Sequence, residues 1–249
     1  MKKQIPNIIT LLNLLSGCIA IVLAVQNQLA LAAIFVAIGI VFDFLDGLAA
    51  RLLKVQSAIG LQLDSLADLV TCGVVPGIVM FQLLRMADTN GWESAAGTSS
   101  DFLETMIAHP LPLLGFLITL ASAYRLAKFN IDENQVSSFV GLPTPANALL
   151  ILSFPLILWY HNNDSLNEIL LNPLFLAGAT LFSAFILNAN LPLFALKFKS
   201  FNIKENGFRY LFIITSFILA LTMEFIAIPI IIGVYIAMSI VMNLKAKQV

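Results

Sequence analysis

The sequence predicts an all-α, polytopic integral membrane protein, a bundle of about eight spanning helices with both termini in the cytoplasm. The chain of 249 residues is 59% hydrophobic and only 11% charged, whereas about 25% of the residues of a soluble domain are charged. The apolar residues form runs close to the length of about 20 residues that a spanning helix needs. No polar stretch is long enough for a separate soluble domain, so residues 1–249 are expected to form one integral domain.

Eight apolar runs are separated by short polar or turn-forming segments. The first follows Lys2 and Lys3 and continues past Cys18, so we expect a retained spanning helix and not a cleaved leader. The last two runs are separated only by Met223 and Glu224, which leaves seven spans as the alternative. In chain order, the predicted spans are 7–25, 29–52, 60–84, 110–129, 145–160, 173–193, 210–222 and 225–244.

The charged residues orient this bundle. With the N-terminus in the cytoplasm, all of the 13 basic residues except Arg85 fall in cytoplasmic segments, while the predicted outer segments carry mostly acidic residues. Short cytoplasmic loops of membrane proteins are enriched in Lys and Arg. The pattern therefore predicts an even number of spans and a cell (inner) membrane protein with both ends inside.

Four aspartates interrupt the second and third predicted spans near their cytoplasmic ends: Asp43, Asp46, Asp64 and Asp68. A charge at the centre of a spanning helix costs roughly 2.5–3.5 kcal/mol on insertion scales. The first two are spaced i, i+3 and the last two i, i+4, so each pair shares a helix face. Oxygen-only ligands favour hard cations. We therefore expect the four carboxylates to hold Mg²⁺ or Mn²⁺ for phosphate chemistry at the cytoplasmic face.

Further residues complete a pattern around these aspartates, D-x2-D-G-x2-A-R-x8-G-x3-D-x3-D, which adds Gly47, Ala50, Arg51 and Gly60. The pattern resembles the signature of the CDP-alcohol phosphotransferases. The resemblance implies a CDP-linked donor, two divalent cations held by the four aspartates, and Asp68 as the general base on an acceptor hydroxyl. It also implies that the two glycines, the alanine and the arginine line the donor site. A homodimer is expected by analogy with the family.

The first span has polar residues near i, i+3 spacing at its cytoplasmic end: Asn7, Thr10 and Asn13. Such spacing places side chains on one face of a helix. We expect this face to line the nucleotide pocket; ordinary helix polarity is the alternative.

Three further segments narrow the acceptor alcohol. Residues 64–76, 124–130 and 139–146 resemble runs of the phosphatidylserine synthases within the family. The resemblance implies CDP-diacylglycerol and L-serine as substrates, and we expect Arg125, Lys128 or Asn130 to bind the acceptor or a phosphate. Membrane anchoring by positive charge is the alternative for the two cations. The catalytic core is expected at about 5–160, with C-terminal spans at about 173–244.

Two other functions remain open at this point. Glycerol 3-phosphate or an inositol phosphate could replace serine in the same reaction, although their phosphates would need more basic residues in the pocket. A cation or proton transporter would use the intramembrane aspartates as a pathway. No Walker loop or dinucleotide fingerprint is present, and we expect membrane lipid but no nucleic acid as a partner.

Overall fold

Helices form nearly all of the regular structure in the computed structural model. It describes residues 4–55, 57–88, 104, 106–131, 139–161, 163–194 and 203–246. Side chains at 139–140, 203–205 and 245–246 are outside this description. The predicted cytoplasmic charges Lys2, Lys3, Lys197, Lys199 and Lys247 and most of the predicted outer loop lie outside the described residues.

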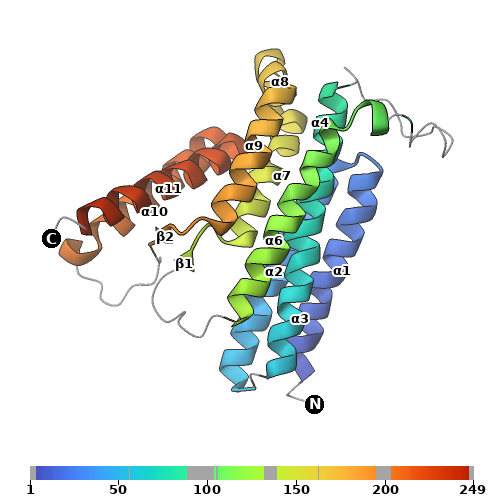
Figure 1. Ribbon diagram of the computed structural model, residues 1–249. Coiled ribbons are helices and arrows are strands. Elements are labelled where there is room, and N and C mark those ends of the chain that lie inside the picture. The colour runs from blue at the N-terminus through green and yellow to red at the C-terminus, as the bar shows by residue number, and fades with distance from the viewer. Residues whose placement is uncertain are drawn as a thin grey trace.

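The N-terminal part of the bundle contains the helices that carry the four aspartates. Helices α1 (Ile5–Val25), α2 (Leu29–Leu53) and α3 (Ala58–Asp68) lie side by side, with α6 (Phe116–Ile131) and α4 (Val75–Asp88) continuing the bundle (Figure 1). Lys54 ends α2 in the left-handed conformation (φ +54°), and Ser57 begins α3 as its N-cap by accepting from the Gly60 amide. This short reversal makes α2 and α3 antiparallel, as the sequence predicts.

The third predicted span is not one uniform α-helix. A π-helical segment, Leu69–Val74 (η2), separates α3 from α4 directly after Asp68. Pro76 follows the segment and lacks the amide that would bond the carbonyl four residues earlier, which disfavours a regular turn here. Thr119 on α6 donates to the Gly73 carbonyl at 3.0 Å. The π segment is therefore tied to a neighbouring helix.

The remaining elements complete the bundle. They are a 3₁₀ turn before α6, Leu111–Gly115 (η3), α7 (Thr144–His161), α8 (Asp164–Leu170), α9 (Pro173–Asn188), α10 (Ile203–Met223), a 3₁₀ turn, Glu224–Ile226 (η4), and α11 (Ala227–Ala246). The antiparallel strands β1 (Phe139–Val140) and β2 (Pro192–Leu193) pair Phe139 with Leu193. Helix α9 ends at Asn188, earlier than the predicted 193, because the chain turns into β2.

Each predicted apolar run coincides with described helical structure. By length and hydropathy, five helices of the described chain qualify as spans, and six if the pair α8 and α9, bent by 56°, counts as one. One of the five, Asn206–Leu244, covers most of α10 and α11, which lie side by side and tilt away from the other helices in Figure 1. The protein is an integral membrane helical bundle; the count of eight spans and the cytoplasmic termini stay predictions.

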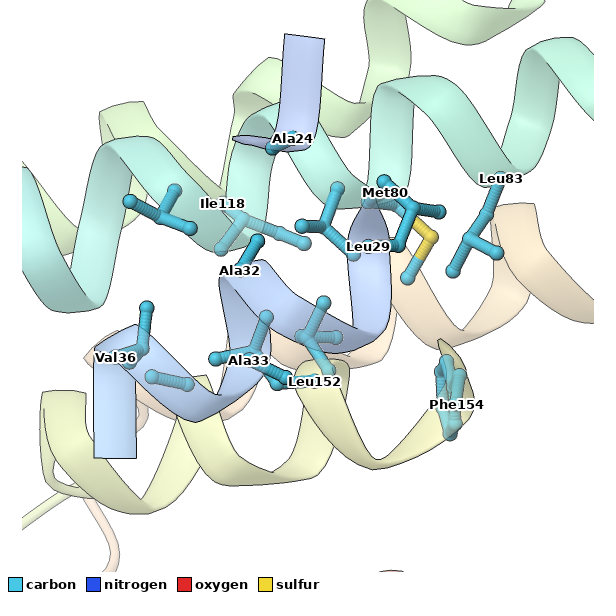
Figure 2. Close-up of a cluster of buried hydrophobic side chains, with 14 of the residues drawn as sticks. Ala24, Leu29, Ala32, Ala33, Val36, Met80, Leu83, Ile118, Leu152 and Phe154 are labelled. Atoms are coloured by element: carbon cyan, nitrogen blue, oxygen red, sulfur yellow. The ribbon is translucent and has the colours of Figure 1, made fainter. Parts of the chain in front are cut away.

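The main apolar core lies toward the end of the bundle opposite the aspartates. The first half of α2 packs its small side chains, such as Ala32 and Val36, against Met80 of α4 and Leu152 of α7 (Figure 2). On α2 these residues precede Asp43 by about two turns or more, given 3.6 residues per turn. The core therefore fixes the helices at one end while the polar residues gather at the other.

Candidate active site

Three of the four aspartates form a compact carboxylate cluster. Asp43 and Asp46 from α2 and Asp64 from α3 each place a carboxylate oxygen within 4.8 Å of the others. Among the described residues, this is the group of at least three His, Cys, Asp or Glu side chains that lie close enough together to hold a metal ion. The antiparallel reversal at 54–57 brings the two helices together at this level. The i, i+3 spacing on α2 turns Asp43 and Asp46 to one side of that helix.

The chemistry of this cluster fits a hard divalent cation. All its donors are carboxylate oxygens, the ligands that Mg²⁺ and Mn²⁺ prefer. Asp64 Oδ1 is buried and has no hydrogen-bond partner within the described structure, so it has a lone pair available for a ligand. Thr10 donates to Asp46 Oδ2 at 2.5 Å and orients this carboxylate from α1. A metal-binding carboxylate is commonly held by such an outer hydrogen bond.

A cavity of about 410 Å³ opens beside the carboxylate cluster. It lies between the start of α1, the end of α2 and the start of α3. Its lining consists of Pro6, Asn7, Thr10, Asp46, Gly47, Ala50, Val55, Ser57, Ala58, Gly60, Leu61 and Asp64. Five of the predicted donor-site residues, Asn7, Thr10, Gly47, Ala50 and Gly60, are thus brought together on one cavity.

The two signature glycines leave space in different ways. A methyl group added at Gly47 would meet no described atom within 4 Å, so this wall of the cavity is open. A methyl group added at Gly60 would lie 3.1 Å from Ser57 Oγ and 3.2 Å from Asn7 Oδ1. Gly60 therefore allows α1 to approach the start of α3 closely.

Two predicted donor-site residues are not among the lining residues of this cavity. Arg51 is exposed and folds along its own helix, where its Nε donates to the Gly47 carbonyl at 3.0 Å. Asn13 is fully buried, and its Nδ2 donates to Asp68 Oδ1 at 3.3 Å. Asp68 itself lies outside the group of three carboxylates and is 9% exposed.

The three predicted acceptor residues on α6 do not share one contact region. Arg125 Nη1 donates to the Leu187 carbonyl at 2.7 Å, at the end of α9. Asn130 Oδ1 accepts from Ser65 at 3.0 Å, next to Asp64 on α3. Lys128 is exposed.

Sequence reasoning missed several residues at the site. Ser57 and Val55 line the cavity, and Thr71 donates to the carbonyl of Asn13, whose side chain contacts Asp68. The position of Ser57 could have been predicted, because serine is preferred just before the first residue of a helix, where its side chain accepts a hydrogen bond from an amide of the first turn. The role of Thr71 could not, since it depends on contacts between helices.

The aspartate signature can now be compared with known proteins. Residues 3–189 match the profile of the CDP-alcohol phosphatidyltransferase family. The chain is 33% identical over 158 residues to a CDP-diacylglycerol–serine O-phosphatidyltransferase of Bacillus subtilis, covering 61% of this chain and 76% of the relative.

Two archaeal relatives are similar at the same level. One is an archaetidylserine synthase of Methanothermobacter thermautotrophicus, which is 33% identical over 158 residues (63% of this chain). The other is a CDP-diacylglycerol–serine O-phosphatidyltransferase of Methanocaldococcus jannaschii, which is 33% identical over 150 residues (60% of this chain). The match spans 59% of the length of each, less than two thirds. Because the family profile covers most of the chain and includes all four aspartates, the chain belongs to the CDP-alcohol phosphatidyltransferase family and is a membrane phosphotransferase.

Proposed function

We propose that this protein transfers the phosphatidyl group of CDP-diacylglycerol to the hydroxyl of L-serine, giving phosphatidylserine and CMP. The observation that carries the chemistry is the carboxylate cluster of Asp43, Asp46 and Asp64 beside a cavity of about 410 Å³. Serine as the acceptor is supported by the names of the relatives from Bacillus subtilis and Methanocaldococcus jannaschii.

The reaction is a single displacement at phosphorus. The serine hydroxyl oxygen forms a bond to the phosphorus that carries diacylglycerol, and the bond from that phosphorus to the bridging oxygen of CMP breaks. The hydroxyl proton passes to Asp68, which acts as the general base. This role is supported by the hydrogen bond from Asn13 Nδ2 to Asp68 Oδ1, which leaves the other carboxylate oxygen to accept the proton.

Two divalent cations, Mg²⁺ or Mn²⁺, are the proposed cofactors. Asp43, Asp46 and Asp64 would hold them, and when bound they would neutralise the charge of the donor diphosphate. The prediction that Asp68 is also a ligand stays a prediction, since the grouping of oxygens does not include it. Thr10 would keep the Asp46 carboxylate in its binding orientation.

The donor is proposed to occupy the cavity between α1, α2 and α3. Gly47, Ala50 and Gly60 leave room for the cytidine diphosphate, and Asn7 and Ser57 offer hydrogen-bonding groups. Arg51 lies one turn beyond Gly47 at the end of α2; a rotamer change would bring its guanidinium toward a phosphate, to which it can bind in a bidentate manner. The lipid tails would extend sideways between helices into the bilayer.

The acceptor is proposed to bind beside α6, through Arg125, Lys128 or Asn130. Asn130 has the most support, because it contacts Ser65, the neighbour of the cluster residue Asp64. The active site is proposed to lie at the cytoplasmic face of the cell (inner) membrane, within a catalytic core at about 5–160. The homodimer expected by analogy stays a prediction.

The function is tested by CMP release from the purified full chain with CDP-diacylglycerol and Mg²⁺ or Mn²⁺. Parallel reactions contain L-serine, glycerol 3-phosphate, myo-inositol or inositol 1-phosphate. Asp68→Asn is the blank, and Asp164→Asn, at an exposed position at the start of α8, is the matched control. Release with serine alone, lost in Asp68→Asn, is the expected result. Release with another acceptor would overturn the substrate, and the absence of release from folded protein with every acceptor would favour transport.

A further inference from the structure

Asn13 is a buried polar residue of α1 that does not line the cavity. Asn7 and Thr10, on the preceding turns, line the cavity, whereas Asn13 is 0% exposed and is not a lining residue. Its Nδ2 donates to Asp68 Oδ1 at 3.3 Å. An ionised carboxylate only accepts hydrogen bonds, so the amide must present its N–H and not its oxygen to Asp68.

The opposite side of the Asn13 amide is held by packing. Its Oδ1 has no hydrogen-bond partner in the described part of the chain. A methyl group added at Gly39 on α2 would lie 2.9 Å from this oxygen and 2.7 Å from Thr71 Cγ2. The absence of a side chain at Gly39 therefore gives the amide and Thr71 the space that they occupy.

Thr71 connects Asn13 to the π-helical segment that begins after Asp68. Thr71 is 0% exposed, and its Oγ1 donates to the backbone carbonyl of Asn13 at 3.2 Å. A methyl group at Gly17, one turn further along α1, would lie 3.1 Å from Thr71 Cα. Asn13 is thus tied both to the carboxylate of Asp68 and, through the Thr71 hydroxyl, to the π-helical segment that follows Asp68.

We infer that Asn13 is a positioning residue for Asp68 and not a donor-binding residue. By holding Oδ1, the Asn13 amide fixes the orientation of the Asp68 carboxylate and leaves the second oxygen to accept the hydroxyl proton. Gly39 and Thr71 hold the amide in place. This inference rests on the proposed function of Asp68 as the base, since a base that is misplaced by about 1 Å can lose a factor of about 100 in rate.

The test separates kcat from KM in the purified full chain. Asn13→Leu keeps the branched shape but removes the N–H, and Asn13→Ala removes the N–H without adding bulk. We expect kcat to fall by about 100-fold in both, the loss that a misplacement of about 1 Å can cause. KM for CDP-diacylglycerol and the Mn²⁺ concentration for half activity should stay as in the wild type.

The matched control is Ser16→Ala, one turn further along α1, where the hydroxyl donates only within its helix to the Leu12 carbonyl. Its kcat should be unchanged. An increased KM for CDP-diacylglycerol with unchanged kcat in the Asn13 variants would assign Asn13 to the donor and overturn the inference. Unchanged kcat and KM in the Asn13 variants would also overturn the inference. Failure of both variants to fold would overturn it as well, because Asn13 would then serve stability.

Failure of the proposed function would be visible separately, in the wild type. If the wild type uses an acceptor other than serine, the kcat and KM comparison is made with that acceptor and still decides the role of Asn13. If the folded wild type releases no CMP with any acceptor, the proposed function and the positioning role are both overturned.

Discussion

Single side chains of α1 contact two of the four aspartates. Thr10 donates to Asp46, a member of the carboxylate cluster, and Asn13 donates to Asp68, which lies outside it. The Thr10 hydroxyl has one hydrogen and two acceptors in range, Asp46 Oδ2 at 2.5 Å and the Pro6 carbonyl at 3.0 Å. A hydrogen bond to a charged acceptor is the stronger of the two, so the hydroxyl serves the carboxylate.

Thr10→Val should weaken metal binding with little change in helix packing, because valine keeps the shape of threonine but cannot donate. The loss of an outer hydrogen bond to a metal ligand costs about 10–100-fold in metal affinity or activity. We expect the Mn²⁺ concentration for half activity to rise by about that factor, measured by CMP release across a Mn²⁺ series. Thr10→Ser retains the hydroxyl and should stay close to the wild type; an equal loss in both variants would contradict the role given to the hydrogen bond.

At the scale of elements, a turn and an arginine close the end of α9. Three hydrogen bonds end on carbonyls at or just after the last turn of α9. Leu142 N donates to Ile186 O at 3.0 Å, and Gly141 N donates to Leu191 O at 2.9 Å. Arg125 Nη1 donates to Leu187 O at 2.7 Å. The last carbonyls of a helix have no partner within it. The hydrogen bond to the Leu187 carbonyl gives Arg125 a structural role between α6 and α9.

Gly141 is the position in this turn where only glycine fits. Its φ is +74°, and a methyl group there would lie 2.5 Å from the Leu187 carbonyl oxygen and 3.0 Å from Arg125 Nη1. Gly141→Ala should lower the free energy of unfolding by about 1–3 kcal/mol, the range for a non-glycine residue in a strained backbone region. The measurement is denaturant unfolding in detergent micelles.

Gly178→Ala is the matched control for this loss. Gly178 lies within α9, and a methyl group there would meet no described atom within 4 Å. The variant should be at least as stable as the wild type, since alanine is the better helix former. Equal stability of Gly141→Ala and Gly178→Ala would show that the turn is not strained by a side chain.

At the scale of the whole molecule, apolar packing and polar chemistry occupy opposite ends of the bundle. The core around Val36 and Met80 lies at one end, and the cavity lies where the N-terminal part of α1 meets the reversal between α2 and α3 (Figures 1 and 2). The predicted topology would place the cavity at the cytoplasmic face, where water-soluble serine and CMP are exchanged.

The predicted topology places both termini in the cytoplasm. Lys3→Cys and Gln248→Cys, each made after Cys18 and Cys72 are replaced by serine, should react with a membrane-impermeant thiol reagent only in inside-out vesicles. Ser99→Cys, in the predicted outer loop, should react only in right-side-out vesicles. An odd number of spans would instead place the two terminal cysteines on opposite sides.

The sequence by itself determined the helical segments, the aspartate signature and the family. This information is local: an apolar run makes a helix in a membrane whatever surrounds it, and i, i+3 or i, i+4 spacing places two side chains on one face. The shared face of Asn7 and Thr10 followed from their spacing, whereas Gly47, Ala50 and Gly60 were expected at the donor site because of the family resemblance.

Only the tertiary structure decided which residues of these faces meet. Thr10 and Asn13 share a polar pattern, yet packing of α1 against α2 and α3 gives the first to Asp46 and the second to Asp68. Arg125, Lys128 and Asn130 lie within six residues, yet two of them contact different helices, α9 and α3. Such pairings depend on helix crossings and on the space left by Gly17 and Gly39, which no periodicity within one segment encodes.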